Sequence, residues 1–166
     1  MDLRETQRPL KDGYRNDPAS SRITLQATGS QVDDGAIACS IDIGRAVYEA
    51  QAHSGVGGAG TGACSGDLLL GALAACAQIT CQMVAESMEL DARSIGVSVE
   101  GDLDLRGTLG IDRDTPVGFQ EIRVRFEIDA PGASREQLDS LARKTERYCV
   151  VMQTLRSAPA ITVEFT

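Results

Sequence analysis

Apolar and polar residues alternate in five stretches of the chain, the pattern of β-strands with one buried face. The first two stretches flank a turn signal at Val32-Asp33-Asp34-Gly35 and predict a β-hairpin, with Gly29 and Ser30 interrupting the first strand. The third and fourth are the longest and most regular. The stretches run over residues 23–27, 37–43, 95–105, 122–128 and 161–165.

Two other stretches repeat apolar residues every three or four positions, which is typical of helices. The first begins at Ser65, a plausible N-cap, has Asp67 in its first turn and ends near Glu89. Small residues crowd its middle, so we expect it to be buried on most sides. The second begins with a capping box, Ser134 with Gln137, and continues as an apolar stripe to Cys149.

The resulting order, β-β-α-β-β-α-β, predicts an α+β domain whose helices pack on one face of an antiparallel sheet. The chain has 166 residues, which fits one domain. Residues 1–20 are polar and carry two prolines, so we interpret them as an N-terminal arm and residues 21–166 as the domain.

Charge and composition exclude several classes of function. The net charge is −8, which disfavours nucleic-acid binding through a broad basic face. The chain has one histidine and no CxxC motif, so we expect no multi-histidine metal site and no zinc ribbon. Residues 68–85 carry no charge, yet we interpret them as a buried central helix rather than a membrane span. The N-terminus has no apolar run, and the five cysteines are odd in number, so we expect a reducing cytoplasm.

Two glycine motifs precede the first helix. Gly55-x-Gly57-x-x-Gly60 matches the dinucleotide fingerprint, but no apolar strand is expected before it, so a loop is favoured. Gly62-Ala63-Cys64-Ser65-Gly66 has the form of a nucleophile elbow. A cysteine hydrolase built on Cys64 would require contact with His53. At the start of the helix Cys64 could also be a reactive thiol, and we include it as a supporting site residue. The alternative, which we favour, is that Cys64 is a partly buried spectator.

Cys76 and Cys149 lie on the apolar stripes of the two predicted helices, and these stripes are expected to pack together. Periodicity alone favours two buried packing cysteines over a redox pair. A redox pair would need a thiolate, and Cys76 is in mid-helix, with no lysine or arginine on its own helix to stabilise it. Cys76 and Cys81 are too far apart on one helix to form a disulfide.

Three segments resemble the OsmC/Ohr family of osmotically inducible and organic hydroperoxide resistance proteins. The segment 64–76, Cys-Ser-Gly-Asp-Leu-Leu-Leu-Gly-Ala-Leu-Ala-Ala-Cys, is similar to the family's "P-x-E-L-L-L-A-A-L-A-x-C" helix. The segment 146–155, with Tyr148-Cys149-Val150, resembles its "Y-C-P-V-x-x-T-L" motif. Gly118-Phe119-x-x-Ile122 resembles its "G-F-x-x-I". Order and spacing agree from about residue 36 to the end.

The resemblance implies an OsmC-like fold: antiparallel sheets around two long central helices in an intertwined homodimer. It also implies a thiol peroxidase in which Cys76 attacks an organic hydroperoxide and Cys149 resolves the sulfenic acid as a disulfide. An external dithiol, lipoyl-linked in the best-known branch, would reduce that disulfide. No metal, flavin or haem is implied, and we expect no nucleic-acid or membrane partner.

The chain also departs from the family pattern, which indicates a divergent OsmC-like branch. Gly66 stands where the peroxidase branch has a glutamate, and Asp67 is the nearest acid. Val150 replaces the proline that usually follows the second cysteine. No motif places the activating arginine; Arg45 is the first candidate and Arg22 the second. The alternative is a non-catalytic protein of the same fold that binds a small hydrophobic ligand at the dimer interface.

Overall fold

The computed structural model describes residues 28–31, 38–42 and 47–165, with isolated positions between 5 and 17. The chain divides into two compact units. The first comprises Met1–Leu69 and Gly101–Ile122, and the second comprises Leu70–Glu100 and Arg123–Thr166. Most of the predicted arm and the predicted strand at 23–27 lie outside the described residues.

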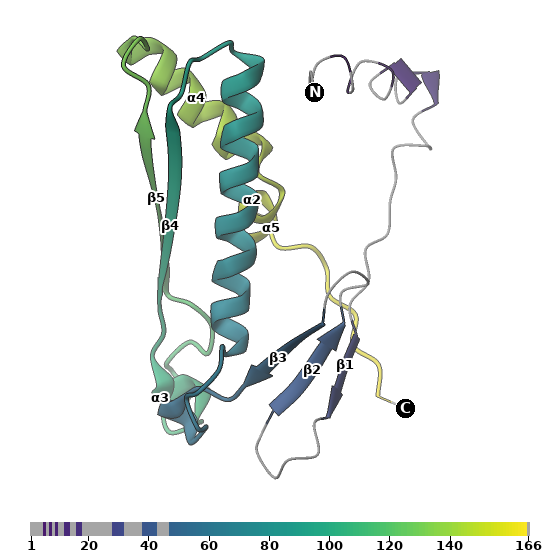
Figure 1. Cartoon of the computed structure of the whole chain (residues 1–166). Coiled ribbons are helices and arrows are strands. Elements are labelled where there is room, and N and C mark those ends of the chain that lie inside the picture. Colours follow the sequence, from purple (N-terminus) through teal and green to yellow (C-terminus); the bar gives the residue numbers. More distant parts are fainter. Residues whose placement is uncertain are drawn as a thin grey trace. The chain divides into compact units, whose positions relative to one another are not determined.

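The first unit contains a three-stranded antiparallel sheet, formed by β1 (Thr28–Gln31), β2 (Ala38–Asp42) and β3 (Val47–Gln51) (Figure 1). The pairing of β1 with β2 places Gly29 opposite Ile41 and confirms a hairpin around the predicted turn. The prediction that Gly29 and Ser30 interrupt the strand was wrong. Both lie in β1, an edge strand, where a small residue weakens pairing without preventing it.

Strand β3 was not predicted, because Val47, Tyr48 and Ala50 do not alternate cleanly with polar residues. It leads directly into the glycine-rich loop, which is closed by a hydrogen bond from the Gln51 N–H to the Ala63 carbonyl at 2.9 Å. A strand therefore does precede Gly55-x-Gly57-x-x-Gly60. The sheet is nevertheless antiparallel, and helix α2 (Ser65–Ser87) begins five residues after Gly60, so the parallel context of a dinucleotide site is missing.

The second unit is built from most of α2, the paired strands β4 (Ser94–Asp102) and β5 (Glu121–Asp129), and the helices α4 (Arg135–Tyr148) and α5 (Val150–Arg156) (Figure 1). Alternate residues of both strands are half-buried, as predicted. The Arg93 N–H bonds the Asp129 carbonyl at 2.7 Å, so the start of β4 meets the end of β5 and the pair is antiparallel.

Helices α2 and α4 contribute to one apolar core in the second unit. Cys81, Val84 and Ala85 of α2 pack with Leu141 of α4, and partly buried side chains of both strands join them. By length and composition α2 could also cross a membrane, since an 18-residue window has a mean hydropathy of 1.8. Only 22% of that window is buried within the chain, and the search covered the described residues alone.

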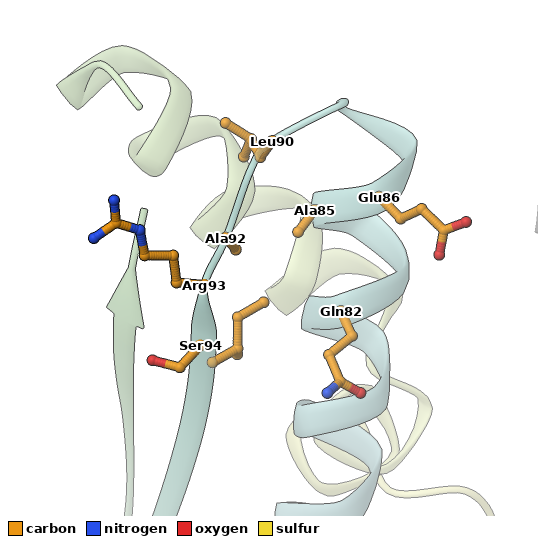
Figure 2. Close-up of a pocket in the computed structure, with 8 residues that line it drawn as sticks. Gln82, Ala85, Glu86, Leu90, Ala92, Arg93 and Ser94 are labelled. Atoms are coloured by element: carbon orange, nitrogen blue, oxygen red, sulfur yellow. The ribbon is translucent and has the colours of Figure 1, made fainter. Parts of the chain in front are cut away.

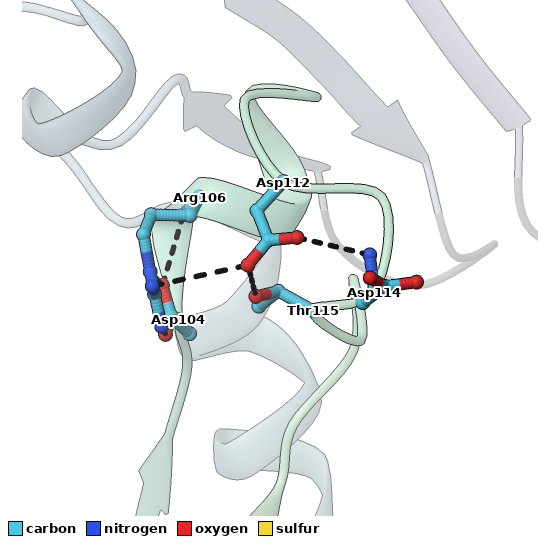
Figure 3. A network of polar contacts seen from close by, with 5 residues as sticks. All are labelled: Asp104, Arg106, Asp112, Asp114 and Thr115. Carbon is cyan, nitrogen blue, oxygen red and sulfur yellow. Dashed lines mark hydrogen bonds and ion pairs between the residues drawn. The ribbon is translucent and has the colours of Figure 1, made fainter.

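Strand β4 ends three residues earlier than predicted, because Asp104 caps a short helix, α3 (Leu105–Thr108). Its carboxylate accepts from the Arg106 backbone N–H at 3.0 Å and from the Arg106 Nη2 at 2.6 Å. The hydrogen bonds from Arg106 lower the pKa of Asp104 to about 2. Figure 3 shows how Asp112 extends the network by accepting from the Thr115 hydroxyl at 2.7 Å and the Asp114 N–H at 3.1 Å. This network rigidifies the turn after β4.

The C-terminal half differs from the prediction in two places. The capping box of Ser134 and Gln137 is confirmed, but a further helix, α5, follows after a break at Cys149. The predicted last strand at 161–165 was wrong for the described chain. Its residues have no strand partner, and the ring of Phe165 is 97% exposed.

Candidate active site

The structure brings Cys76 and Cys149 together in the second unit. Cys76 is half-buried in the middle of α2, beside the buried residues Leu73 and Ala77. Cys149 is fully buried at the break between α4 and α5, where its backbone is extended, with φ −71° and ψ 105°. Both are free thiols, and their side chains are within hydrogen-bonding reach of each other. The sequence predicted that the apolar stripes of the two helices pack together at these residues, and the structure agrees with this prediction.

The environment of Cys76 favours its thiolate. Partial burial raises the pKa of Cys76, but hydrogen bonds outweigh that effect and the net shift is downward. The donors are the Val151 N–H, the Cys149 thiol, the Thr80 hydroxyl and the Val150 N–H. All four are neutral groups. From the sequence we expected a cation to stabilise the Cys76 thiolate. The sequence gives no indication that backbone N–H groups of a distant segment lie against this thiol.

The environment of Cys149 has the opposite effect. Burial raises the pKa of Cys149, and its hydrogen bond and charge interaction with Cys76 raise it further. The backbone N–H groups of Met152 and Val151 oppose this without reversing it. One member of the pair is therefore the better nucleophile, while the other keeps its proton. The two thiols of the pair therefore differ in how readily they ionise.

Val150 contributes a donor that the family's usual proline lacks. We expect Val150→Pro to raise the pKa of Cys76, because proline has no N–H to donate to the thiol. The backbone tolerates the change: Val150 is the first residue of α5, where proline is favoured, and the residue before it is already extended. Thiolate reactivity is lost as pH falls through the pKa, so in the variant this loss begins at higher pH.

The measurement is the pH profile of alkylation at Cys76, resolved by site with mass spectrometry. At pH 7 the thiolate fraction is expected to fall by about tenfold, which corresponds to the lower end of the roughly 1.5–3 kcal/mol that a hydrogen bond to a charged group contributes. Val150→Ala keeps the N–H and is the matched control, with an expected profile like that of the wild type. Identical profiles for the proline and alanine variants would remove Val150 from the site.

Cys64 and Asp67 form a second pair, at the start of α2. The Asp67 carboxylate accepts from the Cys64 backbone N–H at 2.8 Å and from the Cys64 thiol, and these bonds lower the pKa of Asp67. The Cys64 carbonyl accepts the first helical hydrogen bond, from the Leu68 N–H at 3.1 Å. Cys64, rather than Ser65, is therefore the N-cap. The contacts between Cys64 and Asp67 therefore cap the N-terminus of α2.

Gly66 faces an aromatic ring instead of supplying the family's glutamate. A Cβ at Gly66 would lie 3.4 Å from Cζ of Phe119, in ordinary contact. The Asp67 carboxylate caps the helix by accepting from the Cys64 N–H, and its expected supporting role stays a prediction.

The geometry does not support a hydrolase built on Cys64. The Nδ1 atom of His53 accepts from the Gly55 N–H at 3.0 Å and caps a short 3-10 helix, η2 (Ser54–Val56). The thiol of Cys64 is directed to Asp67 instead. No hydrogen bond between His53 and Cys64 is present among the described residues, and the Asp67 carboxylate interacts with both of them.

Two of the predicted site residues are not described by the structure, and three residues near Cys76 were not predicted. Arg45 and Arg22 lie outside the described residues, so their expected role stays a prediction. Three residues of the Cys76 environment were missed: Thr80, Val150 and Val151. Thr80 had a signal in the sequence, since it lies one helical turn after Cys76. In the described part of the chain, no group of three or more metal-ligating side chains comes together.

A pocket of about 300 Å³ opens beside the end of α2 and the start of β4. Figure 2 shows that its charged side chains diverge, with Glu86 directed away from β4 and Arg93 away from α2. A ligand site needs polar groups that converge on one point. The pocket therefore lacks the convergent polar lining of a binding site.

Comparison with known proteins places the fold in a family. Residues 58–164 match the model of the OsmC-like protein family. No curated protein matches the chain. A crystal structure of an OsmC-like protein from Mycoplasma pneumoniae has 18% identity and a TM-score of 0.67, covering 82% of this chain and 89% of that one.

Two further solved structures are of organic hydroperoxide resistance proteins. The one from Legionella pneumophila has 17% identity and a TM-score of 0.59, covering 82% of this chain and 92% of its own. The one from Elizabethkingia anophelis, with thiocyanate bound, has 20% identity and a TM-score of 0.61, covering 83% and 91%. At these identities the structures show a shared fold. Because the family model spans more than half of the sequence, this chain belongs to the OsmC-like protein family.

Proposed function

We propose that this chain is a thiol peroxidase that reduces organic hydroperoxides through Cys76 and Cys149, in a stress-related hydroperoxide resistance role. The observation that carries the proposal is the thiol pair itself: two cysteines in reach of each other, with the pKa lowered at Cys76 and raised at Cys149. Family membership supports the same role at a coarser level, since relatives of this fold are named for organic hydroperoxide resistance.

The proposed reaction has three steps. The Cys76 thiolate attacks the terminal oxygen of the hydroperoxide, the O–O bond breaks, and the alkoxide takes a proton and leaves as an alcohol. Cys76 is then a sulfenic acid. The Cys149 thiol condenses with it, forming a disulfide and releasing water. An external dithiol, which we propose is lipoyl-linked, reduces the disulfide through a mixed disulfide and becomes oxidised itself. The cycle uses no metal or organic cofactor.

Two copies of the chain are proposed to form the working unit. Helix α2 leaves apolar side chains uncovered, including Leu69, Met83 and Ile79, which is 55% exposed. An apolar helix that is mostly exposed needs a partner. A second copy, as in the intertwined dimer that the family resemblance implies, covers this face without requiring a membrane. OsmC-family folds are those of soluble proteins, and we propose a cytoplasmic location.

The deciding experiment follows the consumption of cumene hydroperoxide by the reduced protein in a stopped-flow instrument, with hydrogen peroxide as the comparison substrate. We expect faster reaction with the organic peroxide, because the buried apolar residues Leu73 and Ala77 flank Cys76 on its helix. Sedimentation velocity on the same sample is expected to show a dimer. A reaction no faster than that of a free thiol contradicts the peroxidase, and a monomer contradicts the dimer.

A second function is favoured by one observation, the aromatic ring of Phe119 that lies against Gly66, where the family pattern has a glutamate. On this alternative the protein binds a small hydrophobic ligand and catalyses nothing. A slow reaction with peroxide, together with a bound apolar molecule found by native mass spectrometry of the purified protein, would favour it.

A further inference from the structure

Thr80 interrupts an otherwise apolar face of α2. The buried positions of that helix recur every three or four residues, and all are apolar or cysteine: Leu73, Ala77, Cys81, Val84 and Ala85. Thr80 lies between them and is half-buried. A threonine there loses side-chain freedom and helix propensity relative to alanine or leucine. Packing alone gives no reason for a hydroxyl at this position.

The helix places that hydroxyl one turn from the reacting sulfur. Residues four apart on an α-helix are neighbours on one face, so Thr80 lies directly beside Cys76. The Thr80 hydroxyl is also one of the groups that lower the pKa of the Cys76 thiol. The titratable group that faces this sulfur from the opposing segment is the Cys149 thiol. The other donors identified here, the N–H groups of Val150 and Val151, also come from that opposing segment, whereas Thr80 belongs to the same helix as Cys76.

We propose that the Thr80 hydroxyl is a further part of the reactive site, donating a hydrogen bond that stabilises the Cys76 thiolate and holds its sulfur toward Cys149. The proposal deepens the proposed function and rests on it. It can nevertheless be tested separately from the peroxidase reaction, because it concerns only the ionisation of the Cys76 thiol. Because Thr80 and Cys76 belong to the same helix, their spacing is fixed by the geometry of α2 alone.

The test compares Thr80→Val with Thr80→Ser. Valine has nearly the shape of threonine without the hydroxyl, and serine keeps the hydroxyl without the methyl group. The readout is the pH profile of iodoacetamide alkylation at Cys76, resolved by site with mass spectrometry on the reduced full-length protein. Circular dichroism melting curves confirm that both variants are folded.

In Thr80→Val the midpoint of the profile is expected to move to higher pH. At pH 7 alkylation should fall about threefold: the thiolate fraction falls about tenfold, but a more basic thiolate is intrinsically more reactive. Above the midpoint the variant should therefore react faster than the wild type, so that the two profiles cross. In Thr80→Ser the wild-type profile should be retained. A role in packing alone would produce no such crossing.

A wild-type profile in Thr80→Val overturns the inference, and it is the result expected if the hydroxyl bonds back to the helix carbonyl of Cys76. If both variants shift alike, the effect lies in packing and the inference also fails. These outcomes do not depend on peroxide. A shifted profile in a protein that reduces no hydroperoxide would retain the thiolate contact while rejecting the peroxidase.

Discussion

Replacing Cys76 by serine is expected to abolish the reduction of cumene hydroperoxide, lowering the rate by about a thousandfold or more. The serine hydroxyl does not ionise near neutral pH, so the donors around this position have no thiolate to stabilise. The fold should survive, because serine is close in size to cysteine and the position is only half-buried. The measurement is stopped-flow peroxide consumption by the reduced variant.

Cys64→Ser is the matched control for this variant. Cys64 is another thiol near the same helix, and serine is a favoured N-cap, so the Asp67 contact to the backbone N–H of residue 64 is preserved. Wild-type activity is expected. If Cys64→Ser were inactive and Cys76→Ser active, the reactive thiol would lie at the start of α2 and the proposed function would be wrong.

The sequence was sufficient to predict those parts of the fold in which local pattern and tertiary structure agree. Strands β4 and β5 alternate cleanly, and Ser134 with Gln137 forms its own cap, so each could be recognised without its neighbours. Strand β3 was missed because its pattern does not alternate and its identity comes from pairing with β2. The predicted strand at 161–165 failed for the converse reason, because alternation alone provides no pairing partner.

The site shows the same division between local and long-range information. Helical periodicity indicated that Cys76 and Cys149 face each other, and the family resemblance gave that pair a chemistry. Neither indicated what stabilises the thiolate. The donors from Val150 and Val151 are backbone groups, and a backbone N–H has no sequence signature. Asp67, which the sequence singled out as the nearest acid, has its carboxylate at the start of α2, where it accepts from the Cys64 N–H.

The loss of the family's proline and the retention of both cysteines can be understood together. The donors described around Cys76 are neutral groups, and one of them is a backbone N–H that a proline would remove. At Val150 the chain has an N–H where proline would have none, and it donates to Cys76. The stabilisation that these described neutral donors supply should be less sensitive to salt than that of an ion pair.

Replacing Cys149 by serine is expected to confine the reaction to a single turnover. The Cys76 thiolate remains, and the serine hydroxyl can still donate to it, so one equivalent of peroxide should be consumed at a rate within about threefold of the wild type. The product is then a sulfenic acid that dimedone traps, because no thiol faces it. In the wild type without reductant, one equivalent should instead yield a disulfide between Cys76 and Cys149.

In the wild type, the oxidation of Cys76 itself favours the attack of Cys149 that forms the disulfide. The hydrogen bond to Cys76 and the charge on that thiolate both raise the pKa of Cys149, and both are lost when Cys76 becomes a sulfenic acid. The resolving thiol therefore ionises more readily once it is needed. Two measurements distinguish the wild type from Cys149→Ser: the intact mass after one equivalent of peroxide, and the rate of turnover with dihydrolipoamide as the reductant. If Cys149→Ser sustained wild-type turnover with the dithiol, or if the wild type formed no such disulfide, Cys149 would not be the resolving cysteine.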